Sequence, residues 1–386
     1  MGDSKLDCLI IGCGITGAVI ARNMAEKGCH VTIWDRRSHI GGNMYDFIDN
    51  HGILIHRYGP HTFHTKKKAI YEYISKYADW QPYELRCMAK INGKFTPTPF
   101  NFQTIDDFYT MAGAKKLKKI IKSEFKEKMT ATVLEVMGHE NESIKKYGEF
   151  LFENDYSLYT AKQWGISPDK VDPSILKRVP LRFSYETGYF DDRYQVMPQI
   201  SYTKFFEKIL DHENIDIRLN KEAMGHLLID EERHKVLLDG EICNIPVIYT
   251  GALDELFKID EGPLPYRSLE FKWKYEETDS KQPAPVVAYP QEKDFTRITE
   301  YKKLPVQDVK GTTYAIEYPK AYRYGAGNEP YYPVLTRESN ELYSKYKNRA
   351  DKIKNLYYCG RLADFKYYNM DQALERALVI YKHIML

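Results

Sequence analysis

The chain has 386 residues, of which 43% are hydrophobic and 28% are charged. This composition is typical of a soluble globular protein, and the length favours two or three domains. The formal net charge of +2 is too balanced to indicate a nucleic-acid-binding protein by charge alone. No apolar run reaches the ~18 residues of a membrane span, and residues 1–7 lack the features of a signal peptide. We therefore expect a cytoplasmic protein without nucleic-acid partners or a membrane span.

The cysteines are scattered along the chain, and no pair has the CxxC spacing of a metal or redox site. We predict that they are small buried side chains in a reducing compartment. They are Cys8, Cys13, Cys29, Cys87, Cys243 and Cys359.

A glycine-rich turn follows the first apolar run of the chain. Residues 12–17 read GCGITG and lie between a predicted strand at 9–11 and a predicted helix at 18–27. A second predicted strand at 30–34 ends in Asp35, about 20 residues after the glycines. Together these elements form a βαβ unit that carries the fingerprint of a dinucleotide-binding domain.

Each glycine of this fingerprint has its own role. Gly12 permits the tight turn, Gly14 lets backbone N–H groups approach a pyrophosphate, and Gly17 lets the helix pack closely on the strand. The helix N-terminus adds partial positive charge where the phosphates lie. Asp35 is placed to accept hydrogen bonds from a ribose.

The residues after Asp35 favour one dinucleotide. Gly41 and Gly42 follow it by six and seven positions, and Asn43 comes next. This spacing resembles the extended fingerprint of FAD proteins of the glutathione-reductase type, whereas NAD-binding units usually lack the glycine pair. We therefore predict FAD as the cofactor, with Gly41, Gly42 and Asn43 in its site.

The remaining chain predicts two further structural regions. A hairpin signal at Asn92-Gly93 lies in a β-rich stretch, residues 105–152 have helical periodicity, and residues 264–318 predict an antiparallel sheet. Near the C-terminus, an apolar strand ends at Gly360 and a helix follows at 370–384. This ending resembles the C-terminal segment of the FAD proteins, which assigns Gly360 to the cofactor site.

The predicted fold is α/β: a Rossmann-like FAD-binding domain of the glutathione-reductase type, an inserted helical domain and an antiparallel β-sheet domain. The expected ranges are 1–66, 202–260 and 350–386 for the FAD-binding domain, 103–175 for the helical domain with a mobile substrate loop, and 67–102, 176–201 and 261–349 for the sheet domain.

Several histidines occur within residues 56–65. A metal site is one interpretation, but no carboxylate or thiol cluster accompanies them, and the segment follows directly on the dinucleotide-binding unit. We therefore predict no metal here.

The segments 58–65, 159–165, 177–183, 295–302 and 360–370 occur in an order that resembles bacterial UDP-galactopyranose mutases. That family's motifs are YGxHxFHT, YTxKQWG, KRxPxRF, YTRIxEHK, EPYYP and GRLxxYxYxDM, and each has a counterpart in this chain. The resemblance runs nearly end to end, and the joint occurrence of these motifs is far more specific than the glycine fingerprint.

The resemblance implies an isomerase that interconverts UDP-galactopyranose and UDP-galactofuranose with no net redox change. Reduced FAD is required, because its N5 attacks C1 of the sugar, displaces UDP and forms a covalent flavin–sugar adduct. The implied partners are a UDP-sugar substrate and a flavin reductant, either NAD(P)H or another donor. Members of the family often form homodimers, and the product enters cell-surface polysaccharides.

The resemblance also implies roles for particular side chains. Arg178 and Arg297 match the two arginines that bind the pyrophosphate, where negative charge builds as UDP leaves. His61, His64 and Arg361 match residues near the flavin. His61 is assigned to the cofactor site, His64 to the reaction, and Arg361 to both. The residues implied to bind the substrate are Tyr159, which matches a tyrosine that stacks on uracil, and Trp164, Tyr189, Tyr318, Tyr367 and Asn369.

Six positions depart from the family pattern and leave the sugar and the base open. Two of them are Phe295, in place of a tyrosine, and Tyr301, in place of a histidine. Asn369 replaces an aspartate, Leu85 an asparagine near the sugar, and Asp155-Tyr156 a more apolar pair. The alternatives are a mutase for another nucleotide sugar, such as UDP-GalNAc or a dTDP-linked sugar, or an FAD-dependent oxidoreductase of the amine-oxidase type. His64 favours plain galactose, because a relative that acts on the N-acetyl sugar carries arginine there.

Overall fold

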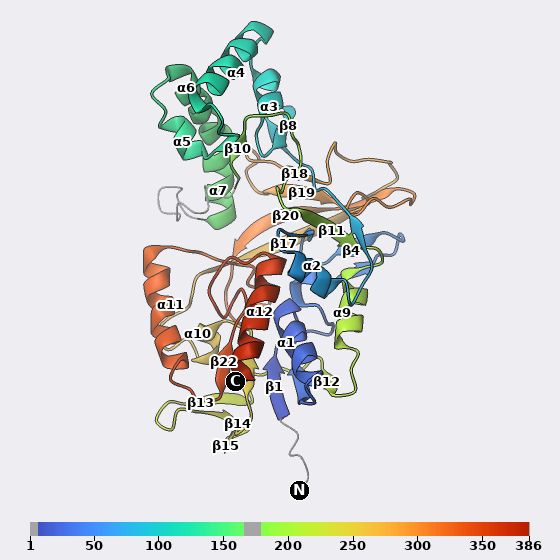
Figure 1. The fold of residues 1–386 in the computed structure, drawn as a ribbon, viewed down its shortest axis with the longest axis vertical. Helices are drawn as coiled ribbons and strands as arrows, with labels where there is room; N and C mark the ends of the chain where they lie inside the picture. The colour runs from blue at the N-terminus through green and yellow to red at the C-terminus, as the bar shows by residue number, and fades with distance from the viewer. Residues whose placement is uncertain (1–6, 166–178, 386) are drawn as a thin grey trace.

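A computed structural model describes residues 7–165 and 179–385 of the chain. One end of the molecule contains a five-stranded parallel sheet (Figure 1). Its strands, in spatial order, are β12 (Ile215–Arg218), β2 (His30–Trp34), β1 (Asp7–Ile11), β16 (Val247–Tyr249) and β22 (Leu356–Tyr358). These strands come from segments far apart in the sequence, and all neighbouring pairs are parallel. The Rossmann-like part of the predicted fold is confirmed, while the predicted domain boundaries stay a prediction.

Three helices cover one face of this sheet. Helix α1 (Ile15–Ala25) packs against α12 (Met370–Ile384) and α9 (Tyr202–Leu210). Helix α9 is amphipathic, because Phe205, Phe206 and Ile209 repeat at helical spacing and are fully buried. Burial of these apolar faces joins the N-terminal unit to segments from the middle and the end of the chain.

A seven-stranded sheet lies across the middle of the molecule in Figure 1. Its strands, in spatial order, are β21 (Tyr332–Pro333), β17 (Tyr266–Glu276), β20 (Thr312–Ala321), β19 (Arg297–Glu300), β18 (Val286–Ala288), β7 (Cys87–Ile91) and β8 (Lys94–Thr98). The prediction of an antiparallel sheet needs one correction, because β18 and β7 pair in parallel. The cause is the upstream hairpin β7–β8, which adds to the edge at β18. Its predicted turn is confirmed, since Asn92 and Gly93 both have positive φ.

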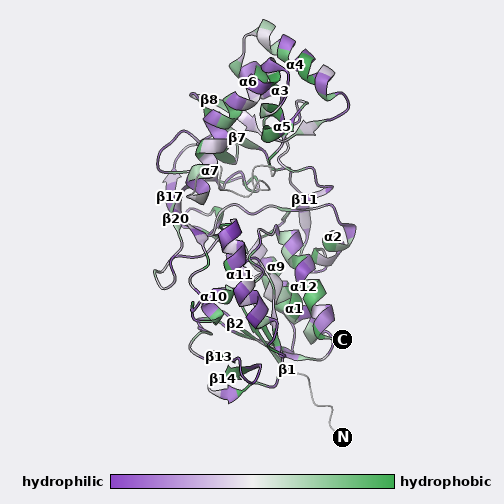
Figure 2. Cartoon of the chain, turned by 90° about the vertical axis from the view of Figure 1, so that its left-hand side faces the viewer, coloured by the Kyte–Doolittle hydropathy of each residue, from purple (hydrophilic) through white to green (hydrophobic). Residues whose placement is uncertain are grey.

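The predicted helical region extends from the hairpin side of this sheet. It consists of α3 (Phe102–Phe108), α4 (Met111–Phe125), α5 (Val133–Met137), α6 (Glu142–Leu151), the π-helix η2 (Phe152–Tyr156) and α7 (Ser157–Trp164). Helix α4 buries Ala114, Leu117 and Ile121 against the other helices and turns most of its lysines outward. Figure 2 shows this alternation of hydrophilic and hydrophobic residues along α4.

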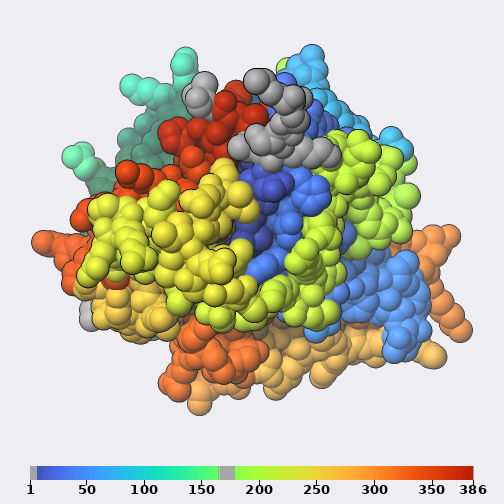
Figure 3. All heavy atoms as spheres, turned by 90° about the horizontal axis from the view of Figure 1, so that it is seen from below, coloured from blue at the N-terminus to red at the C-terminus, as the bar shows by residue number. Residues whose placement is uncertain are grey.

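The remaining elements complete the two ends of the molecule. The smaller sheets are β5 (Phe63–Thr65) with β11 (Tyr194–Pro198) and β6 (Trp80–Pro82), β13 (Leu227–Asp230) with β14 (Lys235–Leu238) and β15 (Glu241–Ile242), β3 (Asp46–Ile48) with β4 (Leu54–His56), and β9 (Thr130–Ala131) with β10 (Leu181–Arg182). The other helices are η1 (Gly42–Met44), α2 (Lys68–Ile74), α10 (Leu253–Leu256) and α11 (Arg337–Ala350). Seen from below, the yellow segment with β13 to β15 forms much of one face beside the blue N-terminal part (Figure 3).

All six cysteines are buried and free, as predicted. In the described residues, no helix is both long and apolar enough to cross a membrane. Within the same residues, no group of three or more His, Cys, Asp or Glu side chains is arranged to hold a metal ion.

Candidate active site

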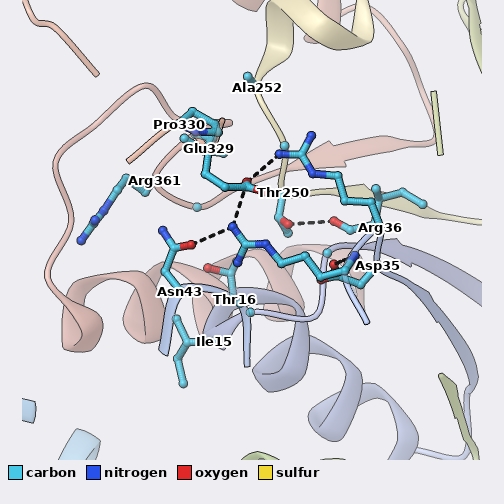
Figure 4. A pocket seen from close by; sticks show the side chains of 18 of the residues that line it. Ile15, Thr16, Asp35, Arg36, Asn43, Thr250, Ala252, Glu329, Pro330 and Arg361 are labelled. Carbon is cyan, nitrogen blue, oxygen red and sulfur yellow. Dashed lines mark hydrogen bonds and ion pairs between the residues drawn. The ribbon is translucent and has the colours of Figure 1, made fainter. Parts of the chain in front are cut away.

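A cavity of about 230 Å³ lies at the carboxyl ends of the parallel strands. Its walls include Ile11 at the end of β1, Trp34 at the end of β2 and Tyr249 at the end of β16. This edge of an open parallel sheet is where ligands bind in doubly wound folds. Figure 4 shows the cavity with the side chains that surround it. We call it the cofactor cavity.

The glycines of the fingerprint are required by space as well as by conformation. Gly12 has φ +107°, and a Cβ there would lie 2.0 Å from Thr250 Oγ1. A Cβ on Gly17 would lie 2.0 Å from the carbonyl oxygen of Gly12. The predicted roles in a tight turn and in close helix packing therefore match the geometry.

A second glycine turn contacts the first. A Cβ on Gly42 would lie 2.9 Å from the Cα of Gly14, and the N–H of Gly41 donates to the carbonyl of Cys13 at 2.9 Å. Gly360 also lines the cavity and has φ +111°. The backbone of three separate segments is thus exposed to the cavity beside the N-terminus of α1, where unpaired helical amides favour phosphate oxygens.

Asp35 is buried and faces both the cavity and the glycine turn. Its Oδ2 accepts the Cys13 N–H at 2.7 Å, and its Oδ1 accepts the Arg37 N–H at 2.9 Å. The carboxylate therefore fixes the turn while it lines the space predicted for a ribose.

Glu329 joins the two arginines that follow Asp35. Its Oε2 accepts from Arg36 at 2.8 Å and from Arg37 at 2.9 Å, and Arg37 donates in turn to Asn43 at 2.9 Å (Figure 4). Sequence reasoning did not assign Arg36, Arg37 or Glu329, although the EPYYP motif begins at Glu329. A dinucleotide fits this cavity, because glycine backbone, a helix N-terminus and a ribose-facing acid converge there.

A second cavity of about 290 Å³ adjoins the first. Five residues line both cavities: Asn43, His61, Arg361, Asn369 and Met370. This second cavity, which we call the substrate cavity, is enclosed by the seven-stranded sheet, the helices η2 and α7, and the segment after β4. A group bound in one cavity is therefore next to a group bound in the other.

The two predicted histidines occupy different places. His61 lies at the shared wall, and burial together with the charges of Arg361 and Arg297 lowers its pKa to about 4. His64 lines only the substrate cavity, where its ring stacks on Phe190 with centroids 3.6 Å apart. Its Nδ1 lies 2.6 Å from Asp192 Oδ2, and this contact fixes the orientation of the ring.

Arg297 supplies a positive charge inside the substrate cavity. Its Nε–H donates to Glu317 Oε2 at 2.8 Å, and Glu317 is 1% exposed. The two residues are opposite each other on β19 and β20. The sequence analysis did not assign Glu317 to the site. Its position opposite Arg297 on the neighbouring strand orients the guanidinium.

The predicted tyrosines divide into two groups. Tyr159, Tyr189 and Tyr367 line the substrate cavity. Tyr318 does not line either cavity. Side chains alternate along β20, so Tyr318 points away from the side on which Glu317 meets Arg297. The Tyr318 ring instead lies under the Lys272 ammonium on the outer side, 4.3 Å from the ring centroid. The structure therefore places Tyr318 away from both cavities, and its assignment to the substrate stays a prediction.

Two unassigned tyrosines line the substrate cavity instead. They are Tyr331 and Tyr332 of the EPYYP motif, and the Tyr332 ring stacks on Tyr367 with an interplanar angle of 7°. Arg361 lies over the Tyr367 ring at 5.1 Å. The motif itself was the signal that could have identified both tyrosines.

Some of the predicted residues cannot be placed. Arg178 and most of the predicted mobile loop lie outside the described residues, and so does the side chain of Trp164. Four of the six positions that depart from the family pattern line the substrate cavity: Leu85, Asp155, Tyr156 and Asn369.

Comparison with known proteins identifies the family. A model of the UDP-galactopyranose mutase family matches residues 155–367, more than half of the chain. A probable UDP-galactopyranose mutase of Klebsiella pneumoniae is 36% identical and covers 96% of this chain and 92% of its own length. The chain belongs to the UDP-galactopyranose mutase family.

UDP-galactopyranose mutases are isomerases, and the prediction of an isomerase is confirmed. A dTDP-fucopyranose mutase of Escherichia coli is also 35% identical, with 96% of each chain covered. A model of the NAD(P)-binding Rossmann-like domain matches residues 10–77.

Solved structures show the same fold at low sequence identity. A reduced UDP-galactopyranose mutase superposes with a TM-score of 0.74 at 15% identity, covering 99% of this chain and 94% of the other. A putrescine oxidase variant with redesigned cofactor binding superposes with a TM-score of 0.60 at 12% identity and 99% coverage of both chains. The predicted fold class is confirmed.

Proposed function

We propose that this chain interconverts UDP-galactopyranose and UDP-galactofuranose, with reduced FAD as its cofactor and no net redox change. The observation that carries this proposal is the shared wall between the two cavities. A dinucleotide site adjoins a site with a half-buried arginine and several tyrosines, which suits a nucleotide sugar held against a flavin.

FAD is the dinucleotide that the cofactor cavity suits best. The glycine pair that resembles the FAD fingerprint contacts the first glycine turn, and Gly360 closes the cavity from the C-terminal segment. Arg361 and His61 lie where the two cavities meet. When bound and reduced, FAD supplies the nucleophilic centre for substitution at C1 of the sugar.

Arg297 is proposed to bind the diphosphate of the substrate. Glu317 holds the Nε side of the guanidinium, so the two Nη groups remain directed toward the cavity. As the bond from C1 to the diphosphate breaks, negative charge builds on the leaving oxygen and interacts more strongly with Arg297. The matching role of Arg178 stays a prediction.

The aromatic side chains are proposed to orient the substrate and exclude water. Tyr159, Tyr189, Tyr332 and Tyr367 form much of the cavity wall and combine apolar ring surface with a hydroxyl. A dry cavity protects an activated sugar from hydrolysis. His61 is neutral near pH 7, so it donates or accepts one hydrogen bond at the flavin without adding charge.

The test is an anaerobic conversion assay on the purified protein. Its flavin is reduced with dithionite, UDP-galactofuranose is added and products are separated by HPLC. Formation of UDP-galactopyranose supports the proposal. Loss of substrate through oxidation of the sugar, with consumption of an electron acceptor, would instead favour an oxidoreductase of the amine-oxidase type.

A dTDP-linked sugar is the second candidate substrate. The dTDP-fucopyranose mutase relative is nearly as similar as the probable UDP-galactopyranose mutase, and Leu85 and Asp155 line the substrate cavity. The same assay with a dTDP-linked furanose and with the UDP-GalNAc isomer compares the three substrates directly. The reductant, the homodimer and the cytoplasmic location remain predictions.

A further inference from the structure

One helical face forms part of the wall of the substrate cavity and does not line the cofactor cavity. Asp155, Tyr159 and Gln163 follow one another at intervals of four residues, and all three line the cavity. Tyr156 and Thr160 lie beside them on the same face. The π-helix η2 continues directly into α7, so Asp155 is held on a rigid element.

Asp155 is the one acidic side chain among the described residues that line this cavity. In the described part of the chain, no hydrogen bond or ion pair joins its carboxyl group to another residue, although it is half-buried. Glu317, by contrast, is paired with Arg297. A half-buried carboxyl group without a protein partner in a binding cavity is available to a ligand.

The position of Arg297 indicates which part of a nucleotide sugar reaches Asp155. Its positive charge lowers the pKa of His61 at the shared wall and also opposes the rise in the pKa of Tyr159 on α7. Arg297 is therefore close both to His61 at the shared wall and to Tyr159 on the helical face. If the diphosphate binds Arg297 and the sugar lies at the shared wall, as proposed above, the base lies against α7 and η2.

We propose that the protonated carboxyl group of Asp155 recognises the imide edge of a uracil or thymine base. This edge presents one N–H donor beside one carbonyl acceptor. A carboxylic acid has the complementary pair, because its O–H donates and its carbonyl oxygen accepts. A carboxylate has only acceptors, so it faces the base carbonyl unfavourably.

The surroundings of Asp155 favour the protonated form. Burial raises the pKa of Asp155 to about 7, and the positive charge of Lys162 opposes this rise. The Lys162 ammonium does not bind the carboxyl group, since it donates to the carbonyls of Tyr289, Glu292 and Phe295 at 2.5–2.9 Å.

Other titratable groups face the same space from neighbouring elements. Tyr156 and Tyr159 on the helical face have pKa values raised by burial, and the pKa of Cys87 on β7 is raised to about 12. These three groups stay neutral between pH 6 and 8.5, and Arg297 stays charged. Asp155 is thus the group on this helical face of the cavity whose charge changes in this range. Lys162, outside the cavity wall, also titrates in this range, because burial lowers its pKa to about 8.

The experiment measures binding of UDP-galactopyranose to the oxidised holoenzyme by calorimetry between pH 6 and 8.5. Oxidised protein prevents turnover, and the substituted diphosphate keeps its charge over this range. We expect wild-type affinity to fall about tenfold per pH unit above pH 7. Asp155→Asn keeps one donor and one acceptor at every pH, so its affinity should change much less with pH than that of wild type.

Two further variants complete the test. Asp155→Leu should bind roughly tenfold more weakly than wild type at pH 6, because the imide edge loses its partners. Glu153→Gln, on an exposed residue of the same π-helix, should keep the wild-type pH profile. Flavin content confirms that each variant is folded.

An equal pH dependence in Asp155→Asn and wild type would overturn the assignment. Tighter binding of GDP-linked than UDP-linked sugar, increasing with pH, would also overturn it, because a carboxylate pairs with the two donors of guanine. Parallel titrations with dTDP-galactose distinguish thymine from uracil. The inference rests on the proposed function, but the two can fail separately. If the protein binds the substrate with the expected pH profile and the reduced enzyme does not convert it, the proposed reaction is wrong and the role of Asp155 in base recognition stands.

Discussion

Arg297 and Glu317 lie opposite each other on neighbouring strands, and the Arg297 Nε–H donates to Glu317 Oε2 at 2.8 Å. Glu317 is almost completely buried, and no hydrogen bond to a described residue reaches its Oε1. Because removal of one partner leaves the other charge buried without compensation, each residue determines the state of the other. The pair fixes the direction of the cation within the substrate cavity.

Glu317→Gln should weaken catalysis through Arg297. The amide oxygen can still accept from Nε, but the negative charge that balances and orients the guanidinium is lost. We expect kcat/KM to fall about tenfold, with flavin content unchanged. Steady-state kinetics of the reduced enzyme checks this, with Glu277→Gln, at an exposed residue directly after β17, as control. Unchanged kinetics in Glu317→Gln would show that the pair does not position Arg297.

Arg297→Ala should remove nearly all activity while the protein still binds its flavin. The variant loses the cation that stabilises the leaving diphosphate, a contribution of about 3 kcal/mol or more, which corresponds to at least a hundredfold in rate. It does not touch the cofactor cavity. Retention of most of the turnover, measured by HPLC, would mean that the diphosphate binds elsewhere.

Sequence patterns predicted the parts of the fold that depend on residues close together in the chain. The βαβ unit, the Asn92-Gly93 hairpin and the amphipathic helices follow from glycine positions and hydrophobic spacing. The parallel pairing of β18 with β7 did not, because it depends on where a distant hairpin docks. No local pattern encodes which edge strand of a sheet receives a partner.

Gly12→Ala should destabilise the protein and lower its flavin content. The new Cβ would meet Thr250 Oγ1 at a backbone conformation that L-residues rarely adopt. Gly28→Ala is a matched control, since Gly28 has φ +84° but open space around the Cβ position. The control variant should lose about 1 kcal/mol of its free energy of unfolding and keep its flavin. Stability is measured by urea unfolding and flavin content by absorbance. Equal losses of both in the two variants would contradict the close contact between Gly12 and Thr250.

Asp254 should make the folded state less stable as pH rises. Burial, with a contribution from Glu255, raises the pKa of Asp254 from 3.8 to about 6. The folded value lies above the unfolded one, so ionisation costs stability from about pH 4 upward, and the cost is complete above pH 6. Between pH 4 and pH 7, the free energy of unfolding of Asp254→Asn should therefore rise relative to that of wild type by up to about 3 kcal/mol.

Urea unfolding at a series of pH values measures this difference. The exposed Asp279→Asn variant is the control and should show the wild-type pH dependence. A constant offset between Asp254→Asn and wild type across the pH range would mean that Asp254 does not titrate as described.

The sequence motifs predicted many of the residues that line the two cavities. They did not predict side chains whose partners depend on how the strands pair. Tyr318 and Glu317 are adjacent in the sequence, and only the register of β20 against β19 shows that Glu317 is the partner of Arg297. Glu329 likewise acts through arginines almost three hundred residues away. Such partners become visible only when the chain is folded.

The most direct test of the account compares the oxidised and reduced forms of one preparation. Each form is incubated anaerobically with UDP-galactofuranose, and the UDP-galactopyranose formed is measured by HPLC together with the flavin spectrum. The account predicts rapid conversion by the reduced form, little conversion by the oxidised form, and a flavin that is still reduced at the end. Equal conversion by both forms, or stoichiometric flavin oxidation during turnover, would contradict it.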